Sequence, residues 1–293
     1  MSTFPQGATA LHDVPALHPL SAFLAPWLAD GVPDLDVLNE LAARCALVSG
    51  SGASLRFVRP VADDRGYEER AYREGTIATR PGNRHDLFNA LIWLAFPRSK
   101  AALNRRHHDS LVLARTAGST GRGTLRDALT QFDECGVVVA GTAPDLWRAL
   151  GEHRWREVFV ERRDELLHST RFIVFGHASH DALAAPFIGL CGKALFIEVD
   201  AAWLDQSQAQ ALGRLDIRLA ALFDHGDFSP RDWQPLPLLG IPGATVDNEQ
   251  SDYYADPRQF RPPRRMQSGS SLGNRWTRKC LEESPGPAGR NAG

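Results

Sequence analysis

Residues 79–109, TRPGNRHDLFNALIWLAFPRSKAALNRRHHD, hold a dense set of side chains that could do chemistry. At the helical spacing of about 100° per residue, the segment 84–96 places an apolar arc opposite a polar one. The polar arc contains His85, Asp86, Asn89 and Trp93. An imidazole beside a carboxylate is suited to general acid–base catalysis, and amide or indole groups are suited to holding a substrate. The pattern therefore predicts two catalytic residues, His85 and Asp86, and two substrate-binding residues, Asn89 and Trp93.

The following segment, 98–114, carries polar side chains on its apolar side. Lys100, Asn104 and His107 repeat at helical spacing beside the leucines, whereas a solvated helix keeps its charges opposite its leucines. Lys100 also lies near a helix N-terminus, where the macrodipole disfavours a cation, and a bound anion would remove that conflict. We expect His107 to act as a general base or acid, and Lys100 and Asn104 to hold an anionic substrate. The structural alternative is a snorkelling Lys100 and a hydrogen-bonded core His107.

Local signals divide this stretch into two helices. Pro81 and Gly82 break the chain before Asn83, whose side chain can cap a helix N-terminus. Pro97 separates the two helical segments. Asp86, at the third helical position, can reach back to the Asn83 N–H and complete a capping box. Capping alone would explain Asp86, so its catalytic role is a hypothesis.

A further candidate histidine lies outside this stretch. His177 follows Gly176 directly after the apolar segment 171–175, RFIVF, where a strand would end and a helix begin. Ligands of open α/β sheets gather beyond the carboxyl ends of strands, so we expect His177 to be catalytic as well. The alternative is a helix N-terminal histidine whose ring binds the backbone. His180 could form a metal face with His177, but two histidines without a third ligand do not define a metal site.

No metal site is assigned from the sequence, because no ligand spacing has the strength of a motif. A metal-dependent variant of the site would use four residues that suit a hard-to-borderline divalent ion: His85, Asp86, His107 and Asp133. Asp133 and Glu134 also end a helical segment, where the macrodipole disfavours anions. A charged partner, a metal ion or full solvation would account for this acidic pair.

Several strings in the chain resemble a known family. They are YEERAYREG at 67–75, HDLFNAL at 85–91, KAALNRRH at 100–107, LRDALTQFDECG at 125–136, RFIVFGHA at 171–178, and PLLGIPG with FRP between Pro237 and Pro262. From about Leu20 to Pro262 the chain resembles the bacterial proteins grouped as domain of unknown function 3025. The H-D-x-x-N-A-L and K-A-A-L-N-x-x-H strings make the resemblance fairly specific. It implies no reaction, ligand or catalytic residue, so function must be inferred from the residues themselves.

Length and composition exclude several classes of protein. The chain has 293 residues, of which 43% are hydrophobic and 23% charged, enough to bury a large core. Its net charge of -2 argues against a general nucleic-acid coat protein. The N-terminus has no basic region followed by an apolar run, and no segment approaches about 18 uninterrupted apolar residues. Four scattered cysteines without C-x-x-C predict neither a disulfide framework nor a thiolate metal site. We expect a cytoplasmic protein that does not bind membranes.

Hydrophobic patterns predict a mixed α/β or α+β fold that is predominantly helical and has a small, mainly parallel sheet. We expect strands at 55–60, 67–73, 136–140, 171–175 and 193–199, the second of them at a sheet edge. We expect further helices at 34–47, 144–167, 177–185 and 206–223. After residue 230, frequent prolines predict an irregular segment packed over the domain. The sequence thus predicts one globular domain over 1–262 with an extended N-terminal arm, and a disordered tail at 263–293.

Two functions of different class fit these features. In the first, the protein is an enzyme with hydrolase- or transferase-like chemistry on an anionic small molecule, bound in a cleft between helices 84–96 and 98–114. In the second, it is a non-catalytic module that binds anions or nucleic acid through the basic segment 98–126, whose Arg105 and Arg106 are expected on the outer face. That segment opposes a single acid, Asp109, with seven basic residues: Arg98, Lys100, Arg105, Arg106, Arg115, Arg122 and Arg126. The enzyme ranks first because no nucleic-acid fold signature accompanies the basic segment. Neither hypothesis identifies a cofactor or an oligomeric state.

Overall fold

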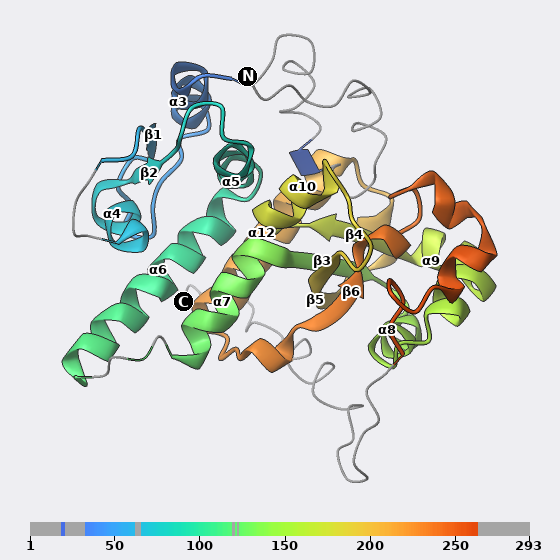
Figure 1. Ribbon diagram of the computed structural model, residues 1–293. Coiled ribbons are helices and arrows are strands. Elements are labelled where there is room, and N and C mark those ends of the chain that lie inside the picture. Colours follow the sequence, from blue (N-terminus) through green and yellow to red (C-terminus); the bar gives the residue numbers. More distant parts are fainter. Residues whose placement is uncertain (1–18, 21–32, 62–65, 119–120, 122, 263–293) are drawn as a thin grey trace, which may run out of the picture.

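The computed structural model describes residues 19–20, 33–61, 66–118, 121 and 123–262 (Figure 1). Its α-helices are α3 (Leu35–Arg44), α4 (Tyr67–Glu74), α5 (Arg84–Ala95), α6 (Pro97–Thr116), α7 (Thr124–Cys135), α8 (Pro144–Gly151), α9 (Arg163–Ser169), α10 (His177–Leu183), α11 (Ala201–Leu204) and α12 (Gln208–His225). Its strands are β1 (Arg56–Val58), β2 (Thr76–Ala78), β3 (Gly136–Gly141), β4 (Thr170–Val174), β5 (Cys191–Glu198) and β6 (Gln234–Pro237). The mixed, predominantly helical α/β class is confirmed. The predicted tail and most of the predicted N-terminal arm lie outside the described residues.

The two helices predicted on either side of Pro97 are present as α5 and α6. Asn83 caps α5, because its Oδ1 accepts a hydrogen bond from the Asp86 N–H at 3.0 Å. The helix ends at Phe96, which precedes the proline and leaves the helical conformation with φ -131° and ψ 58°. The predicted capping box is not reciprocal. The Asp86 carboxylate binds Arg80, and the Asn83 N–H donates to the Arg80 carbonyl instead.

No side chain next to the N-terminus of α6 caps it, and α12 supplies the cap instead. The buried Asp216 accepts hydrogen bonds from Arg98 N at 3.0 Å and from Ser99 N at 2.8 Å. It also accepts one from the Ser99 hydroxyl at 2.6 Å. A carboxylate at this position satisfies free N–H groups and interacts favourably with the helix macrodipole. The contact therefore joins α6 to α12, and the capping residue Asp216 lies 118 positions from Arg98 in the sequence.

The four-stranded sheet has the order β4-β3-β5-β6. β3 pairs antiparallel with β4 and parallel with β5, and β6 pairs antiparallel with β5. Among the described strands of this sheet, one neighbouring pair of three is therefore parallel, so this sheet is mixed rather than mainly parallel. β1 and β2 form a separate parallel pair. The sequence did not predict β6, because its residues lie in the proline-rich segment taken as irregular.

Alternate residues of β3 face two hydrophobic cores. Val138 and Ala140 belong to a core formed with α3, α5, α6, α7 and α12. Val137 and Val139 belong to a second core formed with α8, α9 and the C-terminal segment. Figure 1 shows α7 and α12 on one side of the sheet and α8 and α9 on the other. Because both faces are covered, the inner strands are nearly continuous apolar runs.

The predicted edge strand at 67–73 is wrong, because these residues form α4. Glu69 and Arg73 form an ion pair of 3.1 Å across one helical turn, and Ala71 is fully buried. The helix ends at Gly75, whose φ of 65° is a left-handed conformation that glycine adopts readily. β2 follows directly and pairs with β1.

The segment after residue 230 packs over the second core, as predicted. Its buried side chains include Leu238, Leu239, Tyr254 and Phe260. Within the described ranges, no helix combines the length and the apolar character that crossing a membrane requires.

Candidate active site

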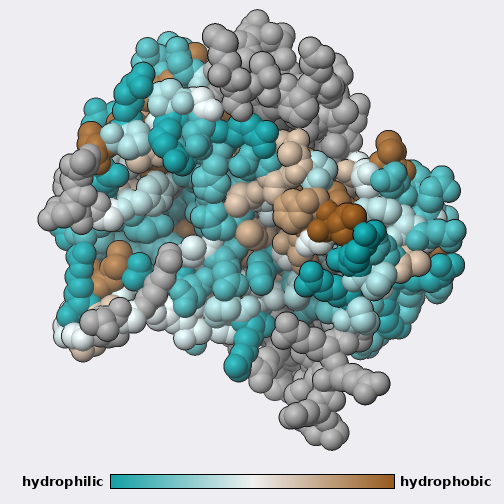
Figure 2. All heavy atoms as spheres, viewed as in Figure 1, coloured by the Kyte–Doolittle hydropathy of each residue, from teal (hydrophilic) through white to brown (hydrophobic). Residues whose placement is uncertain are grey.

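A cleft of about 480 Å³ lies where α4, α5, α6 and α7 meet α10. Its lining includes many charged residues and histidines: Glu68, Glu69, Arg80, His85, Asp86, His107, Arg115, Arg126, Asp133, Glu134 and His177. Five carboxylates among these lining residues oppose three guanidinium groups, so the cleft is net acidic when its histidines are neutral. On the face shown in Figure 2, the surface over α4, α5 and α7 is mostly hydrophilic.

Three helix ends bring two imidazoles and a carboxylate together in this cleft. His85 lies in the first turn of α5, His177 begins α10, and Glu134 lies in the last turn of α7. Glu134 Oε2 is 3.3 Å from His177 Nε2 and 3.9 Å from His85 Nε2. The two imidazole rings meet edge to face, with centroids 4.6 Å apart. The N-terminus of α5 faces Glu134, and its macrodipole offsets the conflict of an acid at the C-terminus of α7.

Gly176 permits this approach of α10 to α7. A Cβ atom at this position would lie 2.4 Å from the carbonyl oxygen of Glu134 and 2.5 Å from the Cα of Cys135. Because these are backbone atoms, a side chain could be accommodated only by moving one of the two helices. A glycine is therefore required immediately before His177 for that histidine to reach Glu134.

A buried polar network supports the floor of the cleft. Lys100, only 3% exposed, places its Nζ 2.5 Å from Asp133 Oδ1 and 3.0 Å from Asn89 Oδ1. Asn89 in turn donates a hydrogen bond to the Tyr67 hydroxyl at 3.0 Å. The Lys100 ammonium also lies 5.3 Å from the centre of the Trp93 ring. The charge of Lys100 is thus neutralised inside the protein by Asp133.

Burial and neighbouring charges shift the protonation of these groups. Burial alone would raise the pKa of Asp133, but the Lys100 ammonium and then His177 hold that pKa below its usual value. Burial lowers the pKa of His177 to about 4, against the opposing effect of Asp133. Burial raises the pKa of Tyr67 well above its usual value. At neutral pH the cleft therefore contains an anionic Asp133, a neutral imidazole at His177 and a protonated phenol at Tyr67.

The structure places the eight predicted site residues in two groups. Five line the cleft: His85, Asp86, Asn89, His107 and His177. Three are buried next to it without lining it: Trp93, Lys100 and Asn104. The two helices therefore do share a cleft, but the cation expected to hold a substrate anion lies in an internal ion pair instead.

Asp86 and Asn104 are engaged in structural contacts. Both Asp86 oxygens bind the Arg80 guanidinium, at 2.7 and 2.9 Å, and this pairing holds the pKa of Asp86 low although burial would raise it. Asn104 accepts a hydrogen bond from Gly50 N at 3.1 Å and donates to the Glu68 backbone and side chain. These contacts attach α6 to α4 through Glu68 and to the turn that contains Gly50.

His107 is the buried imidazole of α6. It is 3% exposed and lines the cleft. Its Nδ1 is buried and makes no hydrogen bond to the described part of the chain. Because Nδ1 has almost no exposed surface, His107 would exchange a proton with a molecule bound in the cleft through its other ring nitrogen, Nε2.

The argument that predicted His177 from strand direction is wrong, although His177 lines the cleft. β4 runs antiparallel to β3, so its carboxyl end lies beside the amino end of β3, where Val174 pairs with Val137. The rule for parallel sheets does not apply at this edge. His177 reaches the cleft because α10 packs against α5 and α7.

Sequence reasoning did not assign Tyr67, Glu68, Arg80 or Glu134 to the site. The first two begin α4, and helical spacing in YEERAYREG would have indicated them had the segment not been taken as a strand. Glu134 was noticed only as an acid at a helix C-terminus. Its meeting with two histidines depends on how three helices pack, which no local pattern encodes.

The basic segment is mostly compensated within the protein. Arg105 pairs with Asp224 at 3.1 Å, and Arg115 pairs with Glu69 at 2.8 Å. Arg106 donates to the Gly226 carbonyl at 2.8 Å. Arg105 and Arg106, expected on the outer face, thus contact the C-terminal end of α12 and the residue after it. These contacts weaken the hypothesis of a nucleic-acid surface.

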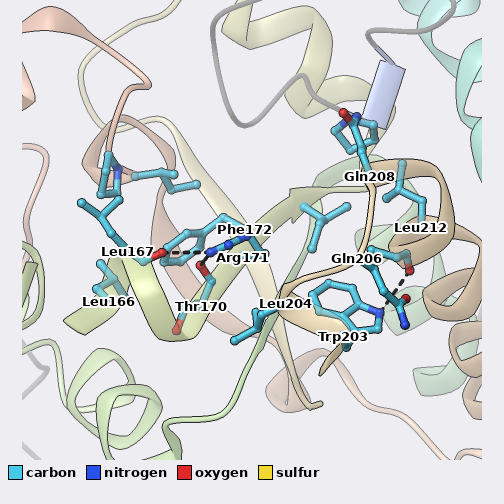
Figure 3. Close-up of a pocket in the computed structure, with 15 residues that line it drawn as sticks. Leu166, Leu167, Thr170, Arg171, Phe172, Trp203, Leu204, Gln206, Gln208 and Leu212 are labelled. Atoms are coloured by element: carbon cyan, nitrogen blue, oxygen red, sulfur yellow. Dashed lines mark hydrogen bonds between the residues drawn. The ribbon is translucent and has the colours of Figure 1, made fainter. Parts of the chain in front are cut away.

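A second hollow, of about 340 Å³, lies beside β4, α11 and the start of α12 (Figure 3). Phe172, Trp203 and Leu212 line it, and Trp203 donates through its ring N–H to the Ala211 carbonyl. Arg171 is the one charged side chain among the described residues that line it, and it donates to the backbone carbonyls of Leu167 and Thr170. None of the described residues that line this hollow is an acid or a histidine, so we place the chemistry in the cleft.

Comparison with known proteins identifies the family. A family model described as "Protein of unknown function (DUF3025)" matches residues 55–264, more than half of the chain. The chain belongs to the DUF3025 family. Searches of curated proteins and of solved structures found no significant match.

In this DUF3025 protein, the family region contains the whole cleft. The lining residues run from Gly66 to His177, within the matched residues 55–264. The helix α3 lies before the matched region. The cleft is therefore built from the part of the chain that the family shares.

Proposed function

We propose that this DUF3025 protein is an enzyme whose active site is the cleft, and that it hydrolyses or transfers a group of a small molecule bound there. The observation that supports the proposal is the gathering of three imidazoles, those of His85, His107 and His177, with Glu134 in one open cleft. Side chains of these types supply proton transfer and electrostatic stabilisation in hydrolytic sites.

His107 is the proposed general base and acid. A water molecule or acceptor hydroxyl attacks the electrophilic carbon or phosphorus of the substrate while His107 takes its proton. The bond to the leaving group then breaks, and His107 returns the proton to that group. The protonated Tyr67 hydroxyl, which also lines the cleft, is suited to donate a hydrogen bond to the oxygen on which negative charge develops.

The charge of the cleft constrains the substrate. The guanidinium groups of Arg80 and Arg115 form ion pairs with Asp86 and Glu69 of the same cleft, so they are already engaged and would have to give up these pairs to bind a substrate anion. An anionic substrate, which we propose, therefore needs a positive charge beyond those of the protein side chains. A carbonyl-bearing or phosphoester substrate that shares a cation with the site meets this requirement.

The test is a hydrolase screen of purified protein with chromogenic carboxylic esters, phosphate monoesters and phosphate diesters. We expect turnover of at least one class, and a loss of kcat of about 100-fold or more in His107→Asn. Tyr67→Phe should lower kcat by about 10-fold or more. The matched control is His168→Asn. His168 lies in α9, its Nδ1 is hydrogen-bonded to the Asp164 carbonyl, and it does not line the cleft.

Activity that survives in His107→Asn at the level of His168→Asn would contradict the role of His107. Absence of turnover in all three substrate classes, by protein shown to be folded by circular dichroism, would contradict a hydrolytic function.

A further inference from the structure

We propose that His85, Glu134 and His177 bind one divalent metal ion in the cleft, and that their chemistry selects Zn²⁺. Each residue offers one ligand atom, and these atoms all lie within 4.8 Å of one another. Two imidazoles and one carboxylate form a donor set that binds catalytic zinc in proteins and leaves a coordination position open.

The distances are close to those of a metal site. Zinc bound to nitrogen and oxygen at about 2.1 Å in tetrahedral geometry places its ligand atoms about 3.4 Å apart. Glu134 Oε2 and His177 Nε2 are 3.3 Å apart, and Glu134 Oε2 and His85 Nε2 are 3.9 Å apart. A small rotation of the half-exposed His85 or Glu134 side chain would close the second distance, and the buried His177 would stay in place.

The Asp133 carboxylate lies next to the buried ligand without a hydrogen bond to it. His177 is 6% exposed at its side chain, and its Nδ1 lies 3.9 Å from Asp133 Oδ2. When Nε2 of a histidine binds metal, Nδ1–H commonly faces a carboxylate, which fixes the ring and its tautomer. The other Asp133 oxygen is held by Lys100 at 2.5 Å. Asp133, itself held by Lys100, is thus the carboxylate that would accept a hydrogen bond from Nδ1–H if the ring moved closer to it on binding metal.

The charge of the cleft favours a cation. Five carboxylates oppose three guanidinium groups in the lining, and the Lys100 ammonium behind it pairs with one of the five, so an excess of negative charge remains that a divalent ion would offset. The open coordination position would face the cleft, where a substrate oxygen could approach the ion. This role in catalysis rests on the proposed function, whereas binding of the ion rests on the ligand geometry alone.

The experiment measures binding of Zn²⁺ and of Co²⁺ to metal-free protein, by calorimetry and by the visible absorption of the cobalt form. We expect one ion per chain at this site, an absorption spectrum of tetrahedral or five-coordinate cobalt, and much weaker binding of Mg²⁺. His85→Asn and Glu134→Gln, both at half-exposed positions, should weaken Zn²⁺ binding by about 100-fold or more. His168→Asn and Glu161→Gln are the matched controls, in α9 and in the π-helical turn before it, and should bind as the unchanged protein does.

The outcomes separate this inference from the proposed function. Equal Zn²⁺ affinity in His85→Asn, Glu134→Gln and the controls, or no binding by folded protein, would overturn the metal site. Preference for Mg²⁺ over Zn²⁺ would overturn the assignment of the ion. Zinc binding lost in both ligand variants supports the site even if no substrate is turned over. If turnover is unchanged by a chelator and is also unchanged in both ligand variants, the metal site is refuted. The proposal that the protein is an enzyme then still stands.

Discussion

Replacing Lys100 by methionine tests whether this lysine is a structural residue of the cleft or a ligand for its substrate. The Nζ atom is buried and lies 2.5 Å from Asp133 and 3.0 Å from Asn89. Lys100→Met would remove both contacts and leave the Asp133 carboxylate, with 16% of its side chain exposed, without its cation. Breaking one partner of a buried pair is destabilising by about 3–5 kcal/mol. Because Asp133 borders the cleft, water can reach it, so we expect about 3 kcal/mol.

A loss of about 3 kcal/mol should lower Tm by roughly 6–12 °C. This uses the shift of about 2–4 °C for each kcal/mol that is typical of proteins of about 150–250 residues. The assay is urea unfolding followed by tryptophan fluorescence and circular dichroism, together with calorimetric Tm. The double variant Lys100→Met/Asp133→Asn removes both charges and should regain about half of the loss or more.

The control is the exposed pair of Arg214 and Asp200, 3.3 Å apart with half or more of each side chain exposed. Arg214→Met should cost less than about 1 kcal/mol, because solvent screens an exposed pair. If Lys100→Met costs no more than Arg214→Met, or if the double variant is as unstable as the single one, the buried pair does not stabilise the cleft. A stable Lys100→Met protein that has lost substrate binding would instead restore the substrate-binding role expected from the sequence.

Three further perturbations test the contacts that position the cleft. Asp216→Ala should destabilise the protein by about 2 kcal/mol in urea unfolding, because it leaves the N–H groups of Arg98 and Ser99 without their acceptor, whereas the Ser99 hydroxyl keeps the backbone carbonyl of residue 216; a change below about 0.5 kcal/mol would contradict the cap. Burial lowers the pKa of His180 to about 3, below the unfolded value of about 6.5, so its contribution is complete above pH 6.5 and is lost as pH falls toward 3. Between pH 7 and pH 5 the free energy of unfolding should therefore fall by about 2 kcal/mol more in the unchanged protein than in His180→Asn, and parallel pH curves would refute this. Gly176→Ala should lower stability by about 1–3 kcal/mol and weaken Zn²⁺ binding, since its Cβ would meet the Glu134 backbone; unchanged binding would show that α10 can shift without moving the ligands.

The sequence by itself determined the local elements that carry the cleft. The helix cap at Asn83, the break at Pro97 and the apolar strand at 136–140 are encoded within a few residues, because caps, proline and hydrophobic spacing act locally. Spacing alone also placed His85 on the polar arc of one helix and His107 on the apolar side of the next. The prediction failed at 67–73, where Tyr67, Ala71 and Tyr72 recur at helical spacing although the segment was expected to be a strand.

Only the tertiary structure decided which charged and polar side chains of different helices contact one another. Lys100 finds Asp133 at 33 positions along the chain, and Asp216 caps α6 at 118 positions, because α7 and α12 pack against α6. Helical periodicity tells which side of a helix is buried, but not which element covers it. Lys100, which was expected to bind the substrate, instead forms a buried ion pair behind the cleft, and the packing of α5, α7 and α10 brought Glu134 next to two histidines. These contacts arise from the choice of packing partners and from strand direction in the sheet, which depend on the whole chain and which no segment encodes alone.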